Sequence, residues 1–267
     1  EVALLELAAV PYPPLHAEAL LAADGLHSGV RRLAFGDQVQ EHFLGGYLAV
    51  VSVPKTLARK GEMSGYLAPG QMAMAYTTDH LDDARAVFLF RTRQPLDYHH
   101  RDVAGQQRYL QTAFAGLAPE VDRWLQEVDR TRAFYFDAIT QLEMGTWSRG
   151  RITLVGDAGY CPGPAVGGST SLAVYGAYVL AHALAASRGD HAAAFAAYER
   201  TMAAPVAGSR TMARVNAKTI VPTSDWGARA LLGAARTISA LPTGLTGRLA
   251  RLNAKGVRLY DTMPLPD

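Results

Sequence analysis

Residues 151–184 read RITLVGDAGYCPGPAVGGSTSLAVYGAYVLAHAL. The first five of them, residues 151–155, form a compact β-branched run that predicts a short strand. This strand leads into a loop rich in glycine and proline, residues 156–170, and the Ala- and Leu-rich stretch after it predicts a helix at roughly 171–187. A strand, a glycine-rich loop and a helix in this order are typical of an α/β domain.

The loop has the properties of a ligand-binding connection. In open α/β sheets, ligands bind beyond the carboxyl ends of the strands, and small residues let the backbone approach a ligand closely. The N-terminus of the following helix presents free N–H groups, and Asp157 at the strand end can accept hydrogen bonds from ligand hydroxyls. These features favour a polar, flat or phosphorylated cofactor. The pattern alone fits a tight strand-to-helix connection without a ligand equally well.

Outward from this stretch, the chain alternates between α/β and β-rich regions. Strand 18–23 is expected to be buried on both faces, and Pro69-Gly70 is expected to turn a hairpin. Residues 101–129 have helical spacing. The order predicts one domain interrupted by another. The remaining expected strands are 2–10, 42–53, 62–68, 71–77, 86–92 and 133–143, and the remaining expected helices are 27–35 and 191–215.

The central stretch resembles the second flavin-binding motif of FAD-dependent monooxygenases of the aromatic-hydroxylase (para-hydroxybenzoate hydroxylase-like) type. In that family a strand ends in Gly-Asp, and small residues, a proline and a Gly-rich turn into a helix follow. The match rests on Gly156, Asp157, Ala158, Pro164 and Gly167.

A second stretch, residues 22–32 (AADGLHSGVRR), looks like the Asp-Gly motif of the same family. Asp24 and Gly25 match the motif, and Ser28 and Arg31 stand at the expected places. A β-rich region separates the two motifs, as it does in the family, where the substrate-domain sheet is inserted at this point.

The resemblance implies an α/β fold with a FAD-binding, Rossmann-like domain that is N-terminally incomplete, an inserted β-sheet substrate domain and a helical C-terminus. The expected boundaries are 1–36 for the partial FAD-binding domain, 37–145 for the β-rich substrate domain, 146–215 for the second part of the FAD-binding domain and 216–267 for a C-terminal helical tail.

The resemblance also implies roles for particular residues. The aspartate of the motif, here Asp157, binds the ribityl chain of FAD, and Pro164 to Ser169 lie against the isoalloxazine ring. The implied cofactors are FAD and, as co-substrate, NADPH or NADH. No catalytic side chain is assigned. The expected cofactor-binding residues are Asp24, Gly25, Gly156, Asp157, Pro164, Gly167, Gly168 and Ser169.

Two departures from the family pattern bear on cofactor binding. No two glycines in the sequence are separated by a single residue, so the GxGxxG unit that binds the FAD pyrophosphate is absent. Ser169 replaces the second glycine of the family's Gly-x-Gly turn. The implied activity is hydroxylation or epoxidation of an aromatic or polyketide-like small molecule with O2. The alternatives are a flavin-free relative, acting as a redox-neutral cyclase, isomerase or binding protein, and a chain that needs a missing N-terminal segment or a partner chain.

The substrate is expected between the β-rich sheet and the flavin. An apolar pocket with methionines suits a polycyclic or polyketide-like molecule. The same side chains also suit the core of the sheet, and alternation places Met72, Met74 and Tyr76 on one face without saying which face that is. The candidate lining residues are Tyr47, Met72, Met74, Tyr76 and Phe136.

Composition narrows the class of protein. Hydrophobic residues make up 49% of the 267 residues and charged residues 19%, which excludes a wholly disordered chain. The formal net charge of +2 gives no support to a nucleic-acid partner. The single cysteine, Cys161, excludes a disulfide framework and fits a cytoplasmic location. Between Asp157 and Arg188 there is no charged residue, but the prolines and glycines of the first half argue against a transmembrane segment.

Four further features have a plain and a functional interpretation. Cys161 is more simply a buried residue than a reactive thiol, and Tyr160 is as well explained by packing as by contact with the cofactor. His99-His100 is expected in a solvated loop, not at a metal site. The basic stretch 218–258 is expected to be a packed helical tail and not a membrane-binding surface.

Overall fold

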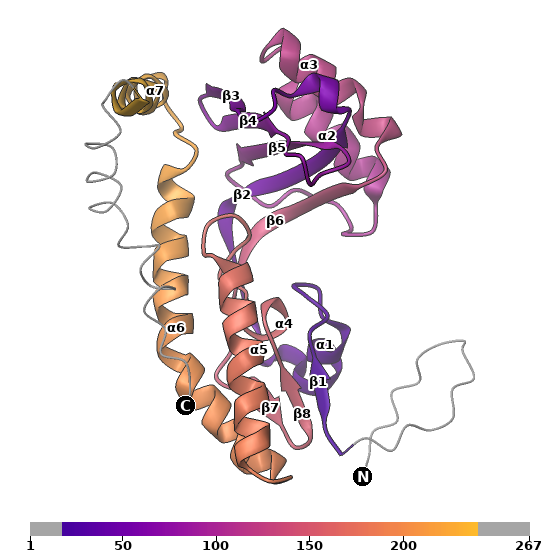
Figure 1. Cartoon of the computed structure of the whole chain (residues 1–267), viewed down its shortest axis with the longest axis vertical. Coiled ribbons are helices and arrows are strands. Elements are labelled where there is room, and N and C mark those ends of the chain that lie inside the picture. The colour runs from indigo at the N-terminus through magenta and orange to yellow at the C-terminus, as the bar shows by residue number, and fades with distance from the viewer. Residues whose placement is uncertain (1–17, 240–267) are drawn as a thin grey trace.

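The structure is a computed structural model and describes residues 18–239. It contains an α/β unit with a three-stranded sheet and a β-rich unit with a five-stranded sheet (Figure 1). From residue 18 the described chain runs through the first unit, passes through the second and returns, so the β-rich unit is an insertion. The expected α/β class with an inserted sheet is confirmed.

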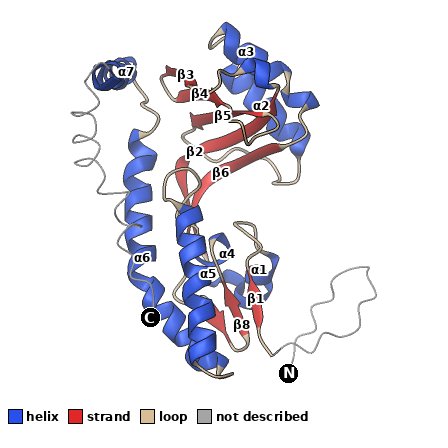
Figure 2. Ribbon diagram, in the orientation of Figure 1, coloured by secondary structure: helices blue, strands red, loops and turns tan. Residues whose placement is uncertain are grey.

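The small sheet joins distant parts of the chain. β1 (Leu20–Ala22) pairs in parallel with β8 (Ile152–Leu154), and β7 (Ser148–Arg149) pairs antiparallel with β8. Helices α5 (Ser169–Ala186) and α6 (His191–Thr219) pack side by side and share one hydrophobic core with this sheet (Figure 2). A parallel pair needs a long crossover, and here the whole β-rich unit lies within that crossover.

The expectation that strand 18–23 is buried on both faces is wrong. β1 is only three residues long, and Leu21 in its centre is 48% exposed. Within residues 18–239 the strand pairs only with β8, so its other edge is uncovered. The expected strand 2–10 lies outside the described residues.

The large sheet is antiparallel throughout, in the order β3-β4-β5-β2-β6. Pro69 and Gly70 connect β3 to β4, and the φ of +76° at Gly70 is one that glycine adopts without strain, so the expected hairpin is confirmed. The strands are β2 (Gln40–Val53), β3 (Met63–Ala68), β4 (Gln71–Tyr76), β5 (Ala84–Arg91) and β6 (Phe134–Glu143).

The two faces of the large sheet have different neighbours. One face packs against α2 (Val103–Phe114) and α3 (Pro119–Gln126), with Phe88 and Trp124 in a shared core. The opposite face carries Leu89 and packs on the glycine-rich loop and on α6. The residues that share this second core are Leu89, Ile139, Val166, Ala213, Ala217 and Val221. The face opposite α2 and α3 is therefore the one that faces the candidate site.

A single long helix runs along both units. α6 has 29 residues, about 43 Å at the rise of an α-helix, and contains Pro205 without ending there. It packs on α5 in the α/β unit and on β2 in the β-rich unit (Figure 1). It passes through the expected boundary at residue 215 and is followed by α7 (Asp225–Ser239).

Smaller elements were not all expected. A short helix, α4 (Asp157–Tyr160), occupies the start of the glycine-rich loop. The region 101–129 is divided near Gly116 (φ +74°) into α2 and α3. The short α1 (Gly29–Phe35) follows β1, and three 3-10 turns lie at Gly36–Gln38, Lys55–Leu57 and Val128–Arg130.

Among the described residues, α5 is the one helix that is long and apolar enough to cross a membrane by length and composition. Such a helix is weak evidence for a membrane span, because core helices meet the same criterion. Leu172, Tyr175 and Val179 of α5 are buried against the small sheet and α6, which is the packing of a core helix.

Candidate cofactor site

The glycine-rich loop begins with a turn that requires glycine. Gly156 has a φ of +64°, and a Cβ there would lie 3.0 Å from the Cβ of Ala173. The turn lets the chain leave β8 and enter α4 directly beneath α5. A larger residue would push the loop away from the helix.

Asp157 lies directly after this turn, at the N-terminus of α4. Its side chain is partly buried. Burial raises the pKa of its carboxyl group, and a hydrogen bond with Cys161 opposes that rise. A partly buried carboxylate at the end of a parallel strand is well placed to accept hydrogen bonds from ligand hydroxyls.

Strand β6 of the large sheet binds the loop from one side. The backbone N–H of Leu142 donates to the carbonyl of Cys161 over 2.8 Å, and Nε2 of Gln141 donates to the carbonyl of Pro162 over 3.1 Å. Gln141 is fully buried. The inserted sheet is thus bonded directly to the predicted cofactor loop.

Helix α6 binds the loop from another side. Ser209 Oγ donates to the carbonyl of Gly167 over 2.6 Å, and Asn216 Nδ2 donates to the carbonyl of Val166 over 2.8 Å. A Cβ at Gly167 would lie 2.5 Å from the Cβ of Pro162, so glycine is needed for this close packing. The loop is therefore held rigidly between β6 and α6.

The far end of the loop is open. Ala165 and Gly168 are exposed, and Gly168 adopts the left-handed conformation (φ +64°, ψ +37°) as the N-cap of α5. No side chain caps this helix, so the backbone N–H groups at its exposed start, Ser169 to Ser171, are available as donors. An uncapped helix N-terminus beside a rigid glycine turn fits the electron-rich edge of a flavin ring or another anionic group.

The Asp-Gly motif is built differently. The Asp24 carboxylate accepts hydrogen bonds from Ser28 Oγ at 2.5 Å and from the N–H of Val30 at 3.2 Å. Burial acts to raise the pKa of Asp24, but the hydrogen bonds outweigh it and the pKa is lowered. Gly25 has a φ of +80°, which only glycine adopts readily. Within the described residues both motif positions shape the turn that starts α1.

Arg31 joins the Asp-Gly motif to the glycine-rich loop. Its Nη1 donates to the carbonyl of Ala158 over 2.7 Å, and its Nη2 donates to the carbonyl of Leu26. Arg31 is 2% exposed, and burial lowers the pKa of its guanidinium, an effect opposed by Glu41 3.7 Å away. One buried side chain thus joins segments 127 residues apart in the sequence.

The candidate substrate residues do not share one face of the sheet. Met72 packs on the core that includes Val166 of the glycine-rich loop, and alternation along β4 places Met74 and Tyr76 on the same face. Tyr47 and Phe136 lie on the opposite face, in the core with α2 and α3, where their rings stack with centroids 5.4 Å apart. The grouping of all five in one pocket is therefore wrong, because the register of β2 and β6 turns these two away from the loop.

Cys161 and Tyr160 follow their plainer interpretations. Cys161 is buried, and burial raises the pKa of its thiol, which makes it a poor nucleophile. Tyr160 is fully buried and accepts a hydrogen bond from Tyr198 Oη at 3.0 Å.

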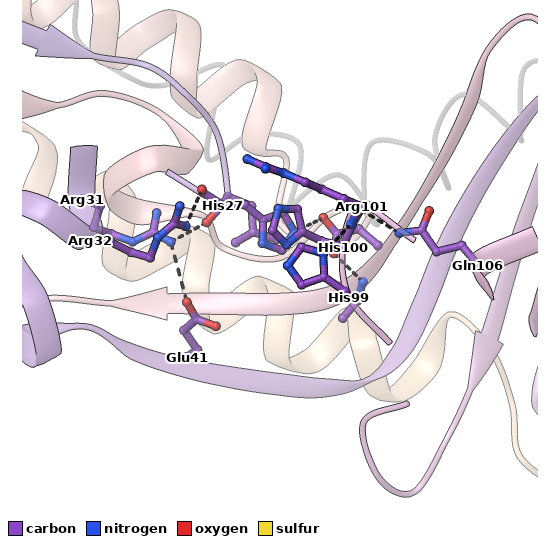
Figure 3. Close-up of polar contacts among 11 residues, drawn as sticks. His27, Arg31, Arg32, Glu41, His99, His100, Arg101 and Gln106 are labelled. Atoms are coloured by element: carbon purple, nitrogen blue, oxygen red, sulfur yellow. Dashed lines mark hydrogen bonds and ion pairs between the residues drawn. The ribbon is translucent and has the colours of Figure 1, made fainter. Parts of the chain in front are cut away.

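The structure also reveals a contact that the sequence did not predict. His27, next to the Asp-Gly motif, bonds Asp137 on β6 at 2.8 Å and stacks on His100. Figure 3 shows His27 and His100 together with Arg31 and Arg32. A cavity of about 240 Å³ borders His27, Arg31, Arg32 and Glu41. Among residues 18–239, no three His, Cys, Asp or Glu side chains form a group suited to a metal ion.

No protein-family model matches the chain. Curated relatives do match it, among them the two that follow. A flavin-dependent monooxygenase from Legionella longbeachae is 37% identical over 180 residues, which are 67% of this chain and 46% of the relative. A flavin-dependent monooxygenase from an unknown prokaryotic organism is 40% identical over 186 residues, which are 68% of this chain and 47% of the relative. The chain thus spans about half the length of the curated relatives it matches.

Solved structures with the same fold cover nearly the whole chain. The tetracycline destructase Tet(51) has a TM-score of 0.77 at 26% identity, and Tet(55) has a TM-score of 0.75 at 30% identity. Both alignments cover 93% of this chain and 62% of the other. Klebsiella pneumoniae HpxO complexed with FAD and uric acid shares the fold, with a TM-score of 0.69 at 24% identity over 93% of this chain and 61% of that one.

Proposed function

The chain belongs to the flavin-dependent monooxygenases, of which it spans about half the length, and from this premise we propose that it holds the isoalloxazine and ribityl end of FAD. We further propose that it acts as an oxidoreductase on an aromatic or polyketide-like small molecule, using NADPH or NADH. The single cysteine, which is buried, suits the cytoplasmic location that we propose with this function.

One observation carries this proposal: the glycine-rich loop is rigid on its inner side and open at the uncapped start of α5. The loop needs no ligand to hold its shape, because β6 and α6 already bind it. Its exposed backbone N–H groups are suited to a ligand that accepts hydrogen bonds.

Each residue of the site has a role in this proposal. The Asp157 carboxylate accepts hydrogen bonds from ribityl hydroxyls. The N–H groups at the start of α5 and the Gly167–Ser169 backbone lie against the ring, and Pro164 excludes water from one side of it. The chemistry that bound FAD supplies in this family is transfer of one oxygen atom from O2 to an electron-rich substrate. Asp24 and Gly25 act by fixing the turn that carries Arg31.

The substrate is proposed to lie between the ring of bound FAD and the sheet face that carries Met72, Met74 and Tyr76, beside the part of this face that packs on the glycine-rich loop. On this face Met72 packs beside Leu89 and Val166 and Met74 pairs with Val87, whereas Tyr76 pairs with Arg85. The names of Tet(51) and Tet(55) refer to tetracycline, a polycyclic molecule, which supports a substrate of similar shape. Exchange of Met72 for lysine would place a charge in the apolar surroundings of Leu89 and Val166 and weaken substrate binding.

The visible absorption spectrum of the purified chain, recorded with and without added FAD, tests the proposal. We expect added FAD to give the shifted absorption spectrum of a protein-bound flavin. Asp157→Ala should lower the affinity for FAD by about tenfold or more. Asp82→Ala, in the exposed connection before β5, is the matched control and should bind FAD as the unaltered chain does. Stimulation of NADPH or NADH consumption by candidate aromatics then tests the activity.

A second function is favoured by one observation, the absence of any Gly-x-Gly spacing in the sequence. If the chain binds no FAD even at high concentration, the monooxygenase proposal fails for the chain on its own. The alternatives are then a redox-neutral cyclase, isomerase or binding protein, or a chain completed by a further segment or partner.

A further inference from the structure

His27 joins the two units of the molecule. It lies in the turn between β1 and α1, and its Nε2 is 2.8 Å from Oδ2 of Asp137 on β6, 110 residues further along the chain. The Asp137 side chain is only 9% exposed, and its Oδ1 accepts the N–H of Ala138 over 2.8 Å. A carboxylate so well covered by protein binds a protonated imidazole more strongly than a surface carboxylate does.

The second partner of His27 comes from the connection between β5 and α2. The ring of His100 is nearly parallel to that of His27, with an angle of 11° between the planes and 4.7 Å between the centroids. Two residues earlier, Tyr98 packs edge-on against Phe136 on the opposite face of the sheet. Segment 92–102 therefore wraps around β6, which is the edge strand. Gln106 Nε2 holds the segment by donating to the carbonyl of His100 over 2.9 Å (Figure 3).

The charged groups around the two imidazoles differ. Asp137 raises the pKa of His27 through its hydrogen bond; partial burial opposes this, Glu41 adds to the rise, and Arg31 acts against it. The pKa of His100 is lowered by partial loss of water around the ring and then by His27. The cationic or protonatable side chains of His99, Arg101 and Arg32 lower it further.

We propose that His27, Asp137 and His100 form a proton-controlled clasp that fastens the α/β unit to the inserted sheet and is closed when His27 carries a proton and His100 does not. In this state one charged ring binds the carboxylate and a neutral ring stacks on it. β6 also bonds the glycine-rich loop through Gln141 and Leu142, so the clasp fixes the sheet above the proposed flavin site.

The two imidazoles open the clasp on opposite sides of the ordinary histidine pKa of about 6.5. Because the pKa of His27 is raised, its contribution is complete below the ordinary histidine value of about 6.5 and is lost as pH rises through the raised value. Because the pKa of His100 is lowered, its neutral form favours the closed state above about 6.5, and this contribution is lost as pH falls through the lowered value. Protonation of His100 then places two stacked cations against each other.

Hydrogen exchange of segment 92–102 in the full chain tests the clasp without any flavin, so a failure of the proposed function leaves this test intact. With rates corrected for the intrinsic effect of pH, we expect protection to peak near pH 6.5 and to fall about threefold or more at about pH 5 and about pH 8.5. An equal protection at all three pH values would overturn the proposal.

Three variants separate the contributions. His100→Phe keeps a stacked ring that takes no proton, so it should abolish the acid opening and leave the alkaline opening. His27→Phe should lower the protection near pH 6.5 and change it little at about pH 8.5, where His27 of the unaltered chain has already lost its proton. His80→Phe, in an exposed turn between β4 and β5, is the control and should keep the normal profile. Acid opening of His100→Phe to the same extent as the unaltered chain would contradict the assignment.

A second measurement serves if His27→Phe fails to fold. Histidine ring signals of the unaltered chain, followed by NMR from about pH 5 to about pH 9, should show one imidazole titrating above and one below the ordinary value. Asp137→Asn should lower the higher of the two. Titration of both imidazoles at the ordinary value would overturn the clasp.

Discussion

Gly176 in the middle of α5 is the residue where the backbone most needs the absence of a side chain. A Cβ at this position would overlap the hydroxyl group of Tyr160 and lie 3.1 Å from Cε of Met202. Glycine in a helix interior is normally less stable than alanine, yet here we expect Gly176→Ala to lower the free energy of unfolding by about 1–3 kcal/mol. Urea denaturation followed by circular dichroism measures the change.

Two variants check this cause. Gly176→Ala combined with Tyr160→Phe removes the overlapping hydroxyl and should recover most of the loss. Gly233→Ala, in α7 with no atom within 4 Å of the added Cβ, should be neutral or stabilise the chain by up to about 1 kcal/mol. A loss of stability in Gly233→Ala as large as in Gly176→Ala would show that the contact with Tyr160 is not the cause.

Asp157 is proposed to bind FAD, but its buried carboxylate lowers the free energy of unfolding at neutral pH. Burial raises its pKa, so at neutral pH the folded chain carries a carboxylate that would be more stable in the unfolded chain. We expect Asp157→Asn to raise the free energy of unfolding at about pH 7 and the gain to vanish below about pH 3.9, where both states are protonated. Denaturation curves at the two pH values measure this, and a gain that persists in acid would contradict it.

At this scale the sequence predicted some contacts and could not predict others. The glycine turns at Gly156 and Gly167 follow from local chemistry, because backbone strain and close packing need glycine whatever the distant partners are. The bond between His27 and Asp137 spans 110 residues, and no local pattern contains it. The prediction of Tyr47 in the substrate pocket was also wrong for lack of distant information. Alternation divides a strand into two faces but does not say which face a helix covers.

Among the elements, α1 and α4 depend on a single buried guanidinium. Lysine in place of Arg31 cannot donate to the carbonyls of both Leu26 and Ala158 in the same geometry. We expect Arg31→Lys to lower the free energy of unfolding by about 1–3 kcal/mol. The neighbouring Arg32 is exposed, so Arg32→Lys should change stability by less than about 0.5 kcal/mol. Equal losses in the two variants would rule out the buried link as the cause.

Most elements were predictable because their patterns are strong. The antiparallel strands alternate, the Pro69-Gly70 turn has a fixed geometry, and α5 and α6 are long and rich in alanine. The elements that were missed, α4 and β7, are too short for a period to show, and they exist because Gly156 and the β8 pairing position them. The exposure of Leu21 in β1 could not be predicted, because an apolar run does not show whether both faces of a strand are covered.

For the whole molecule, Gln141 is the side chain that joins the most parts. It donates to the carbonyls of Pro162 and Arg210 and accepts from Arg214 Nε at 2.8 Å. Gln141→Leu keeps the size but leaves these groups without partners, and we expect a loss of about 1–3 kcal/mol in the free energy of unfolding together with weaker FAD binding. Thermal denaturation and flavin titration measure the two effects.

The control for this change is Gln40→Leu, at the exposed start of the neighbouring strand β2. It should leave both stability and flavin affinity nearly unchanged. Loss of stability with unaltered flavin affinity in Gln141→Leu would show that the position of β6 does not shape the cofactor loop.

The parallel pairing of β1 with β8 sets the order in which the chain can fold. Bringing these strands together directly closes a loop of about 130 residues. The ends of β2 and β6 lie opposite each other, with Gln40 paired to Glu143, so a formed inner sheet shortens the open loop to about 27 residues. The entropic cost of closing the loop then falls by about 1.4 kcal/mol. Formation of the inserted sheet therefore favours pairing of β1 with β8, which flank it in the sequence. We therefore expect the inner unit to assemble early, so a mutation that delays it should also slow formation of the cofactor loop, even where the mutated residue does not contact that loop.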